Sequence, residues 1–504
     1  MKLRVAFRVD ATSRIGTGHF MRCLTLAEAL RQRSAQIRFV SRGLPAYLSE
    51  MLESRGFEFA RLNRAAGEAA GDLPHSSWLG TSQDRDVQDS TAALAGRKWD
   101  WLVVDHYALD ARWERAMRGV ARRILTIDDL ADRQHDCEVL LDQSYYRDMH
   151  TRYQGKVPEQ CRLLLGPRYA LLRGEFRKLR AQVEPRSGAV RRILVFFGGF
   201  DAGNCTGLAI RALAGLDISG RAVDVIIGAQ HPHREEIEQA CATQGYICHV
   251  QTPHMAELMA AADFAIGAGG SATLERCCVG LPALSLCTAE NQRRQITDAA
   301  ELGLLFAPSG EGDLVEMLRR HARCLMENGH LLQLISKTGM AFVDGMGAIR
   351  VSSVIGLEKI EIRRAQENDS KDLFQWRNHP VIRAVSRDSR SIDWDAHCMW
   401  LSAVLLDEDR ELLIGYAGEQ PVGVVRFDKT EGIAEVSIYL VPEAGMNGQG
   451  RNLLLSAEQW LVRHRSDMRK IRAEVLGANV ASQKLFLDAG YRLENIHYLK
   501  EMKG

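Results

Sequence analysis

Short apolar runs alternate with amphipathic stretches between residues 3 and 287. Strands that alternate with helices at this spacing predict parallel sheets covered by helices on both faces. We therefore expect an α/β fold in this part of the chain. The runs are LRVAFRV, IRFVS, WLVVD, RILTID, ILVFFGG, VDVIIG, DFAIGAG and ALSLC.

The series of runs breaks around residues 145–190. The segments YYRDMHTRYQGKVPEQ and AQVEPRSGAVRR are polar and rich in Arg, Pro and Gly, and a new strand is predicted to start at Arg192. Two Rossmann-like domains with a cleft between them are indicated, at residues 1–170 and 171–350.

The pattern changes again near Ile360. The stretch IEIRRAQENDSKDLFQW is followed by the hairpin-like ELLIGYAGEQPVGVVRFDK, the strand AEVSIYLVPE and two helices. This mixture predicts a third, α+β domain at residues 360–504.

Composition narrows the class of function. The 504 residues include 65 basic and 64 acidic side chains, a net charge of +1, and no long block of one sign. This balance argues against a nucleic-acid groove or an anionic membrane surface as partner.

No segment reaches the roughly 18 to 20 apolar residues of a membrane span, and the start MKLRVAFRVD lacks a signal-peptide core. We expect a cytoplasmic enzyme acting on a small molecule. The 11 cysteines form no zinc-like spacing, and we interpret them as reduced core thiols.

The loop after the first predicted strand carries a candidate catalytic residue. FRVD is followed by ATSRIGTGH and an amphipathic helix, so His19 is predicted at a helix N-terminus on the sheet edge where α/β proteins bind ligands. A histidine placed there suits general-base work near neutral pH. The alternative is that His19 only caps the loop.

Polar residues also follow two other strands at the same predicted edge. Asp105, His106 and Tyr107 follow WLVVD, and the pair Asp128 and Asp129 ends RILTIDD. Such residues are candidates for the site, and the alternative is that they are solvated turn residues.

A glycine-rich loop follows the strand DFAIGAG. Glycines let the backbone approach a diphosphate, and a helix N-terminus with hydroxyl side chains supplies donors for it. Glu275, one turn into the following helix, is placed to accept hydrogen bonds from ribose hydroxyls. The candidate binding residues of this loop and helix are Gly269, Gly270, Ser271, Thr273 and Glu275.

The run GAGGSATLERCCVGLPALSLCTAENQRRQ resembles the nucleotide-binding half of GT-B glycosyltransferases. Together with FRVDATSRIGTGHFMRCLTLA, DHYALD, IDDLADRQHDC, LLGPRYALLRGEF and FFGGFDAGN, it is similar to the UDP-2,4-diacetamido-2,4,6-trideoxy-β-L-altropyranose hydrolases of pseudaminic acid synthesis, over about residues 1–345. The resemblance implies a catalytic His19, a cleft residue Tyr107 and a sugar contact Asn291. It also implies metal-independent, inverting hydrolysis of a UDP-linked amino-deoxy sugar by water. No D-x-D metal motif stands out near the loop.

The C-terminal part carries a second set of motifs. VPEAGMNGQGRNLLL places Gly448 and Gly450 between a strand and a helix, which suits a pyrophosphate cradle or an ordinary glycine turn. Downstream, VLGANVASQKLFLDAGYRLE has Asn479 and Ser482 in the order strand, Asn, helix, Gly-aromatic, strand. Residues 360–504 thus resemble the acetyl-CoA-binding core of GNAT N-acetyltransferases, in the subgroup that acetylates nucleotide-linked amino sugars.

Three features of this part bear on acetyl transfer. Asn447 and Asn452 stand where the family's loop usually has Gln or Arg and Gly or Ala. Phe486 stands where many members carry the tyrosine that protonates the CoA thiolate, so Tyr491 and Tyr498 are candidate substitutes. Glu435 is a candidate base for the substrate amine or a solvated strand residue.

Alternatives remain open for the first two domains. They are a glycosyltransferase that delivers the sugar to an acceptor, or a silent module that presents a UDP-sugar to the acetyltransferase. The sequence also leaves open a related diacetamido sugar of the legionaminic type.

Overall fold

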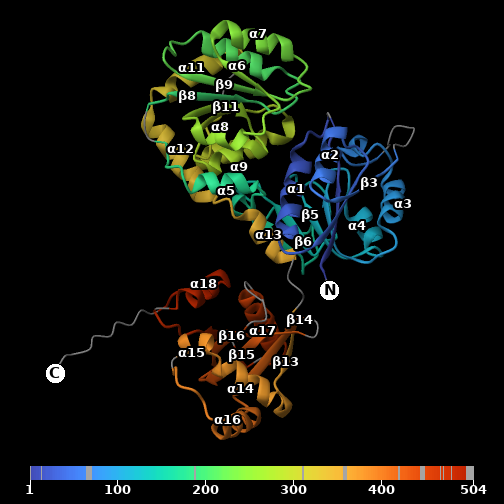
Figure 1. The fold of residues 1–504 in the computed structure, drawn as a ribbon, viewed down its shortest axis with the longest axis vertical. Coiled ribbons are helices and arrows are strands. Elements are labelled where there is room, and N and C mark those ends of the chain that lie inside the picture. Colours follow the sequence, from blue (N-terminus) through green and yellow to red (C-terminus); the bar gives the residue numbers. More distant parts are fainter. Residues whose placement is uncertain are drawn as a thin grey trace, which may run out of the picture. The chain divides into compact units, whose positions relative to one another are not determined.

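The structure is a computed structural model. It describes residues 2–12, 14–63, 71–186, 189–308, 312–355, 360–386, 388–417, 420–442, 449–465, 467–468, 470–477 and 479–494, and it leaves the side chain of residue 291 undescribed. The chain divides into two compact units, Met1–Val354 and Ile355–Gly504. The first unit contains two parallel sheets and the second contains one mixed sheet (Figure 1).

The first sheet has seven parallel strands in the order β3-β2-β1-β4-β5-β6-β7. Its inner strands are mostly buried because helices cover both faces: β1 is buried from Val5 to Val9, whereas the edge strand β3 is not buried. The order in which the chain adds strands reverses between β1 and β4: β2 and β3 lie on one side of β1, and β4 to β7 lie on the other side. Ligands bind at such a switch point in open α/β sheets. The strands are β1 (Arg4–Val9), β2 (Gln36–Ser41), β3 (Glu58–Arg61), β4 (Trp99–Asp105), β5 (Ala121–Ile127), β6 (Val139–Asp142) and β7 (Arg162–Leu165). The helices are α1 (Gly18–Arg31), α2 (Ala46–Ser54), η1 (Ser76–Trp78), α3 (Gln83–Leu94), α4 (Ala111–Met117) and η2 (Pro167–Tyr169).

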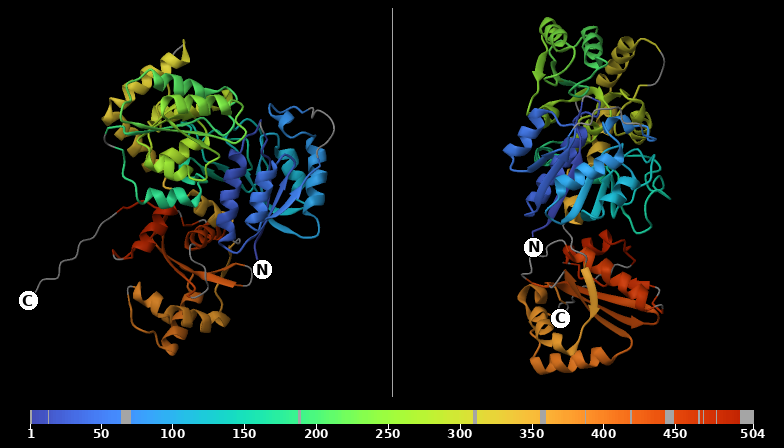
Figure 2. Two further views of the ribbon diagram at one scale, coloured as in Figure 1. Left: turned by 45° about the horizontal axis from the view of Figure 1, so that its top comes forward. Right: turned by 90° about the vertical axis from the view of Figure 1, so that its right-hand side faces the viewer.

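The second sheet has five parallel strands in the order β10-β9-β8-β11-β12, with its own reversal between β8 and β11. One face packs against α6, α7, α11 and α12 and the other against α5, α8, α9 and α10, so the sheet lies between two helix layers (Figure 2). The strands are β8 (Arg192–Phe196), β9 (Ala222–Ile227), β10 (Ile247–Val250), β11 (Phe264–Ala268) and β12 (Ala283–Leu286). The helices are α5 (Gly174–Arg180), α6 (Cys205–Ala214), α7 (Arg234–Gln244), α8 (Met255–Ala261), α9 (Ser271–Cys278), η3 (Glu290–Gln292), α10 (Arg293–Leu302), α11 (Leu314–Met326), α12 (Gly329–Phe342) and α13 (Gly347–Ile355).

The sheet of the second unit is antiparallel from β13 to β16, and β17 pairs parallel to β16. Alternate side chains serve two cores: Leu412 and Ile414 face α14 and α16, whereas Leu413 faces α17. Gly415 leaves room for Leu453 of α17, because a Cβ there would lie 2.3 Å from that side chain. The strands are β13 (Ile360–Arg364), β14 (Arg410–Ala417), β15 (Gln420–Thr430), β16 (Ile433–Leu440) and β17 (Lys470–Arg472). The helices are η4 (Glu367–Asp369), α14 (Ser370–Asn378), α15 (Pro380–Ala384), α16 (Trp394–Leu406), α17 (Gly450–His464) and α18 (Val480–Asp488).

Three expectations about local structure are corrected. The strand before Asn479 ends at Arg472, and residues 491–494 form no strand. The interpretation of the cysteines as core thiols is wrong for Cys287 and Cys324, which are exposed. Within the described part of the chain, no helix is long and apolar enough to cross a membrane.

Candidate active sites

The loop after β1 presents His19 at the start of α1. The helix begins at Gly18, with Thr17 as its N-cap, and Gly16 turns the loop with a φ of 76°. The side chain of His19 is 11% exposed. Gly18 faces the second sheet's loop closely, because a Cβ at Gly18 would lie 3.5 Å from Ser271 Oγ.

Asp105, the last residue of β4, orients the His19 ring. Strands β1 and β4 pair with Val9 opposite Asp105, so the carboxylate lies beside the start of α1. His19 Nδ1 lies 2.6 Å from Asp105 Oδ1. Burial raises the pKa of the Asp105 carboxyl, but Arg22 and then His19 outweigh this effect and hold the pKa well below its usual range. An ionised carboxylate can only accept, so Nδ1 donates to it. In the neutral imidazole this tautomer carries its lone pair on Nε2.

Arg22 joins this pair to a second carboxylate. It is one helical turn from His19, on the same face of α1, and it donates through Nε and Nη2 to both oxygens of Asp105, at 2.6 and 2.7 Å. Its Nη1 donates to Asp129 Oδ2 at 2.9 Å. Asp129 in turn accepts from the hydroxyl of Tyr107, whose ring meets the His19 ring edge to face at 4.6 Å. Asp105, Tyr107 and Asp129 thus converge on one cluster. His106 and Asp128 do not join it: both are buried, His106 beside Asp10 and Asp128 beside Arg133.

The opposite side of the site is the loop between β11 and α9. The helix begins at Ser271, and Gly270 before it has a φ of 82°. Gly269 allows α10 to approach, because a Cβ there would lie 2.5 Å from the side chain of Ile296. The first amides of a helix have no partner within the helix and suit an anion.

Two residues of α9 differ in their placement. Thr273 is buried outside the pocket lining and its hydroxyl accepts from Arg276 Nη2 at 3.2 Å, so its contact with the ligand stays a prediction. Glu275 lines the pocket, 3.6 Å from Arg173. Burial raises the pKa of the Glu275 carboxyl, and Arg173 offsets only part of the increase.

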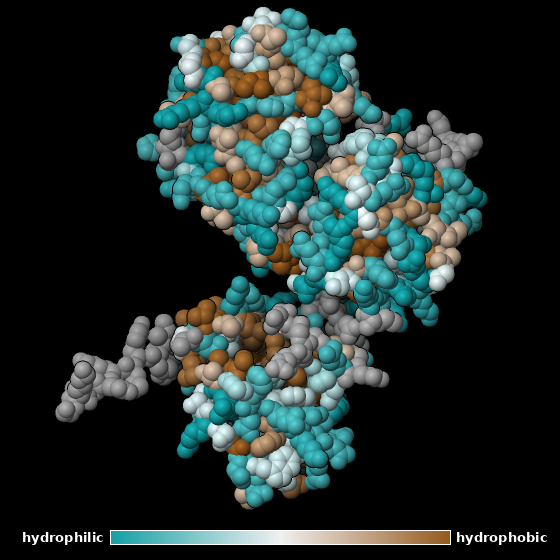
Figure 3. Space-filling model, in the orientation of Figure 1, coloured by the Kyte–Doolittle hydropathy of each residue, from teal (hydrophilic) through white to brown (hydrophobic). Residues whose placement is uncertain are grey.

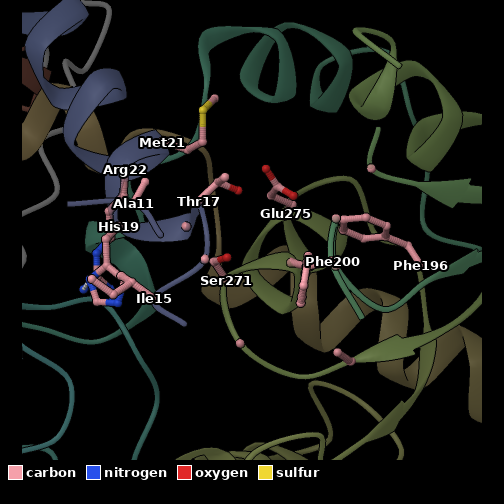
Figure 4. A pocket seen from close by; sticks show the side chains of 18 of the residues that line it. Ala11, Ile15, Thr17, His19, Met21, Arg22, Phe196, Phe200, Ser271 and Glu275 are labelled. Atoms are coloured by element: carbon pink, nitrogen blue, oxygen red, sulfur yellow. Dashed lines mark hydrogen bonds between the residues drawn. The ribbon is translucent and has the colours of Figure 1, made fainter. Parts of the chain in front are cut away.

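These elements enclose one cavity of about 730 Å³, which opens in the groove between the two lobes of the first unit (Figure 3). His19 and Arg22 lie on one side and Ser271 and Glu275 on the other, with Phe200 further along the second lobe (Figure 4). The cavity is large enough for a nucleotide-linked sugar. Other lining residues are Tyr107, Asp129, Arg173, Gly198, Gly199, Gly228, Gly269, Gly270, Thr288, Gln292 and Gln295.

Arg173 lines the pocket without a clear local signal in the sequence. Arg173 precedes α5 in a segment predicted to be irregular, and its place in the pocket depends on the packing of α5 under the second sheet. The side chain of Asn291 lies outside the described residues, although its neighbour Gln292 lines the pocket.

The described part of the candidate acetyl-CoA site is incomplete. Gly448 lies outside the described residues, and Gly450 begins α17. Asn479 caps α18, where its Oδ1 accepts from the backbone amide of Ser482 at 3.1 Å. Glu435 lies on β16, opposite Arg472 and 3.2 Å from its guanidinium group.

Phe486 belongs to the buried core under α17. Its ring lies 5.0 Å from that of Tyr491, whose hydroxyl donates to Glu458 at 2.7 Å. Burial raises the pKa of the Tyr491 hydroxyl, and Glu458 raises it further. Tyr498 lies outside the described residues.

Fold and site together define a GT-B-like pair of Rossmann-like lobes followed by an acetyltransferase-like unit. Residues 371–491 match the model of the acetyltransferase (GNAT) family. In fold, the chain is similar to the structure of Phytolacca americana UGT2 complexed with UDP-2-fluoro-glucose and pterostilbene. That similarity has a TM-score of 0.51 and 11% identity, and it covers 70% of this chain and all of that one.

Three curated proteins resemble the chain in sequence, including the following two. An uncharacterized protein of Methanocaldococcus jannaschii is 22% identical over 97% of both chains. The UDP-2,4-diacetamido-2,4,6-trideoxy-β-L-altropyranose hydrolase of Campylobacter jejuni is 23% identical over 60% of this chain and 97% of its own length. The chain is thus a fusion of a region homologous to this hydrolase, with a GT-B-like fold, and a C-terminal GNAT domain.

Proposed function

We propose that the first unit hydrolyses UDP-2,4-diacetamido-2,4,6-trideoxy-β-L-altropyranose to UDP and the free sugar. The observation that carries the proposal is the His19–Asp105 pair, which faces the N-terminus of α9 across one cavity. A base at one end and an anion site at the other are what displacement of a diphosphate by water requires. Sequence similarity to the Campylobacter jejuni hydrolase supports the choice of sugar.

In the proposed reaction, His19 Nε2 takes a proton from a water molecule as the water oxygen attacks the anomeric carbon. The bond from that carbon to the diphosphate oxygen breaks, and UDP leaves with the electron pair. Asp105 stabilises the imidazolium that forms, as a positioning residue. The amides at Ser271 and the side chain of Arg173 bind the diphosphate, and Glu275 accepts from the ribose. Attack from the side opposite UDP inverts the anomeric centre, and no metal takes part.

The test is incubation with the UDP-sugar, without any acceptor and with a chelator present. We expect stoichiometric UDP and free sugar, with the inverted anomer first in a proton NMR time course. His19→Asn should lose about a hundredfold to ten-thousandfold in turnover while UDP affinity stays within about twofold. A variant within about threefold of wild type would remove His19 from the mechanism. A requirement for an acceptor would identify a glycosyltransferase, and no UDP release over many enzyme equivalents would indicate a binding module.

We further propose that the second unit acetylates the amino group of the UDP-4-amino-sugar precursor, using acetyl-CoA. The match of residues 371–491 to the GNAT model supports it. The amine attacks the thioester carbonyl and CoA leaves as the thiolate, with Gly450 at the start of α17 near the pyrophosphate. Glu435, which contacts Arg472 at 3.2 Å, is the proposed base. Thiol detection of CoA release with isomeric UDP-4-amino-sugars tests this activity and its stereochemical preference.

A further inference from the structure

Arg276 is a buried cation behind the loop between β11 and α9. It is 1% exposed, and its side chain folds back toward the start of its own helix. Its Nη2 donates to the carbonyl of Ala268 at 2.7 Å and to the hydroxyls of Thr273 and Ser285, each at 3.2 Å. Ala268 lines the pocket, and so do the next three residues of the loop. The guanidinium group therefore lies directly behind a wall of the pocket.

Arg276 differs from the other buried arginines of the described residues because no carboxylate pairs with it. Its Nε and Nη1 have no hydrogen-bond partner in this part of the chain. A charged side chain is seldom fully buried without a group of opposite charge beside it. The other buried arginines each form ion pairs with two carboxylates; they are Arg8, Arg22, Arg42 and Arg133.

The place of the charge along α9 makes its burial more costly. The carboxyl end of a helix favours a cation and the amino end disfavours it. Arg186 lies at the favourable end, where its Nη1 donates to the carbonyl of Val279, the C-cap of α9, at 3.0 Å. The guanidinium group of Arg276 lies at the unfavourable end. Burial lowers its pKa to about 10, and nearby Glu275 offsets only part of this effect, so the group is still charged at pH 7.

Resting on the proposed binding of UDP at α9, we propose that Arg276 is a positioning residue that supplies a buried counter-charge for the diphosphate. It holds the carbonyl of Ala268, so that the loop presents its amides to the pocket. Its charge acts through the loop, where water does not screen it. The diphosphate gains negative charge as its bond to the sugar breaks. Arg276 should therefore stabilise the leaving group more than the bound substrate.

The test compares Arg276→Met with Arg186→Met, by calorimetry with UDP, UMP and uridine and by thermal unfolding without ligand. For Arg276→Met we expect UDP affinity to fall about 10- to 100-fold, UMP affinity to fall less, and uridine affinity to stay within about twofold. Its melting temperature should stay within about 2 °C of wild type or rise, because an unpaired buried charge is removed. Arg276→Gln removes the charge but keeps an amide donor, and it should lose UDP affinity to a similar extent.

Arg186→Met is the matched control in the same lobe. Its melting temperature should fall by at least about 3 °C, because carbonyls at the ends of α8 and α9 lose their donor. UDP affinity should stay within about twofold, because Arg186 lies at the other end of α9. The two substitutions thus separate a functional charge from a structural one.

Two results would overturn the proposal. One is a melting temperature of Arg276→Met that falls as far as that of the control, with equal losses for UDP and uridine, because this would show a structural role. The other is UDP affinity within about threefold of wild type in Arg276→Met or Arg276→Gln. Turnover is measured separately. If wild type binds UDP without hydrolysing the UDP-sugar, the proposed hydrolysis fails and calorimetry still decides the role of Arg276. If wild type does not bind UDP, the counter-charge proposal fails.

Discussion

Replacing Asp105 with asparagine tests the orientation of His19 with almost no change of shape. In wild type the carboxylate accepts from His19 Nδ1 and from two nitrogens of Arg22. Asparagine has one oxygen and one amide nitrogen, so it cannot accept all three bonds. The oxygen should stay with the cation, and the amide should then donate to His19 Nδ1. This bond selects the His19 tautomer that carries its proton on Nε2. Nε2 then has no lone pair with which to take the proton of the attacking water.

The size of the effect follows from these contacts. With the base in the wrong tautomer, kcat should fall about a hundredfold to ten-thousandfold. Stability should fall by about 2 to 4 kcal/mol, because the buried Arg22 loses the counter-charge of the buried Asp105 and keeps only its bond to the partly exposed Asp129. The pKa of Asp105 is depressed in the folded state, so this stabilisation is present above the unfolded pKa of about 4 and is lost as pH falls below it.

The assay measures UDP release and thermal unfolding on the same samples at pH 7. The matched control is Asp129→Asn, which also removes one carboxylate from Arg22 but does not contact His19. The control should lose comparable stability and much less activity. The reasoning is refuted if Asp105→Asn keeps turnover within about threefold of wild type, or if the control loses as much activity.

Further expectations concern both units. Glu275→Ala should weaken UDP binding about tenfold in calorimetry, because its carboxylate is assigned to the ribose; unchanged affinity would overturn that assignment. Burial opposes the charged form of His135, but Glu114 outweighs it and raises the pKa of His135 to about 9, so stability should be lost as pH rises from about 6.5 to 9. Melting curves should show up to about 3 kcal/mol of this loss in wild type and less in His135→Gln. Phe486→Tyr should raise CoA release at most about tenfold and lower the melting temperature, because the new hydroxyl enters a buried core. Residues 1–354 and 355–504, expressed separately, should each keep their own activity; acetyl transfer that appears only on mixing would contradict this.

Much of the fold follows from the hydrophobic pattern. All eight apolar runs between residues 3 and 287 form strands, because parallel strands buried on both faces are apolar along their whole length. The strands that the pattern missed are β3, β6, β7 and β10, each four residues long. Runs this short have no clear period, and their pairing depends on the sheet beside them. β7 in particular extends the first sheet into the segment that the sequence indicates as a break.

The sequence predicts which residues lie at the ligand-binding edge of the first sheet. It does not predict which of these residues contact one another. His19 and Asp105 both follow strands, yet their contact depends on the neighbouring positions of β1 and β4, which only the sheet order determines. Thr273 shows that the position of a residue around the axis of α9 decides whether its side chain faces the pocket. The helix begins at Ser271, and each residue turns by about 100°, so Ser271 and Glu275 face the pocket while Thr273 faces Arg276.

The fixed charges of the pocket match the direction in which charge moves in the proposed reaction. On the side of the pocket formed by the first lobe, which we call the floor, the carboxylates of Asp105 and Asp129 both accept from Arg22, and Asp105 also accepts from His19. Across the cavity, Arg173 and the N-terminus of α9 make the UDP side positive, with Glu275 offsetting part of that charge. In the proposed hydrolysis, a proton moves from water to His19 on the floor, and an electron pair moves to UDP on the α9 side. Both developing charges therefore meet groups of opposite sign that are already in place, so little reorganisation is needed during the reaction. An anion site alone would need only the α9 side, so the carboxylate that accepts from His19 favours a catalyst over a binding module.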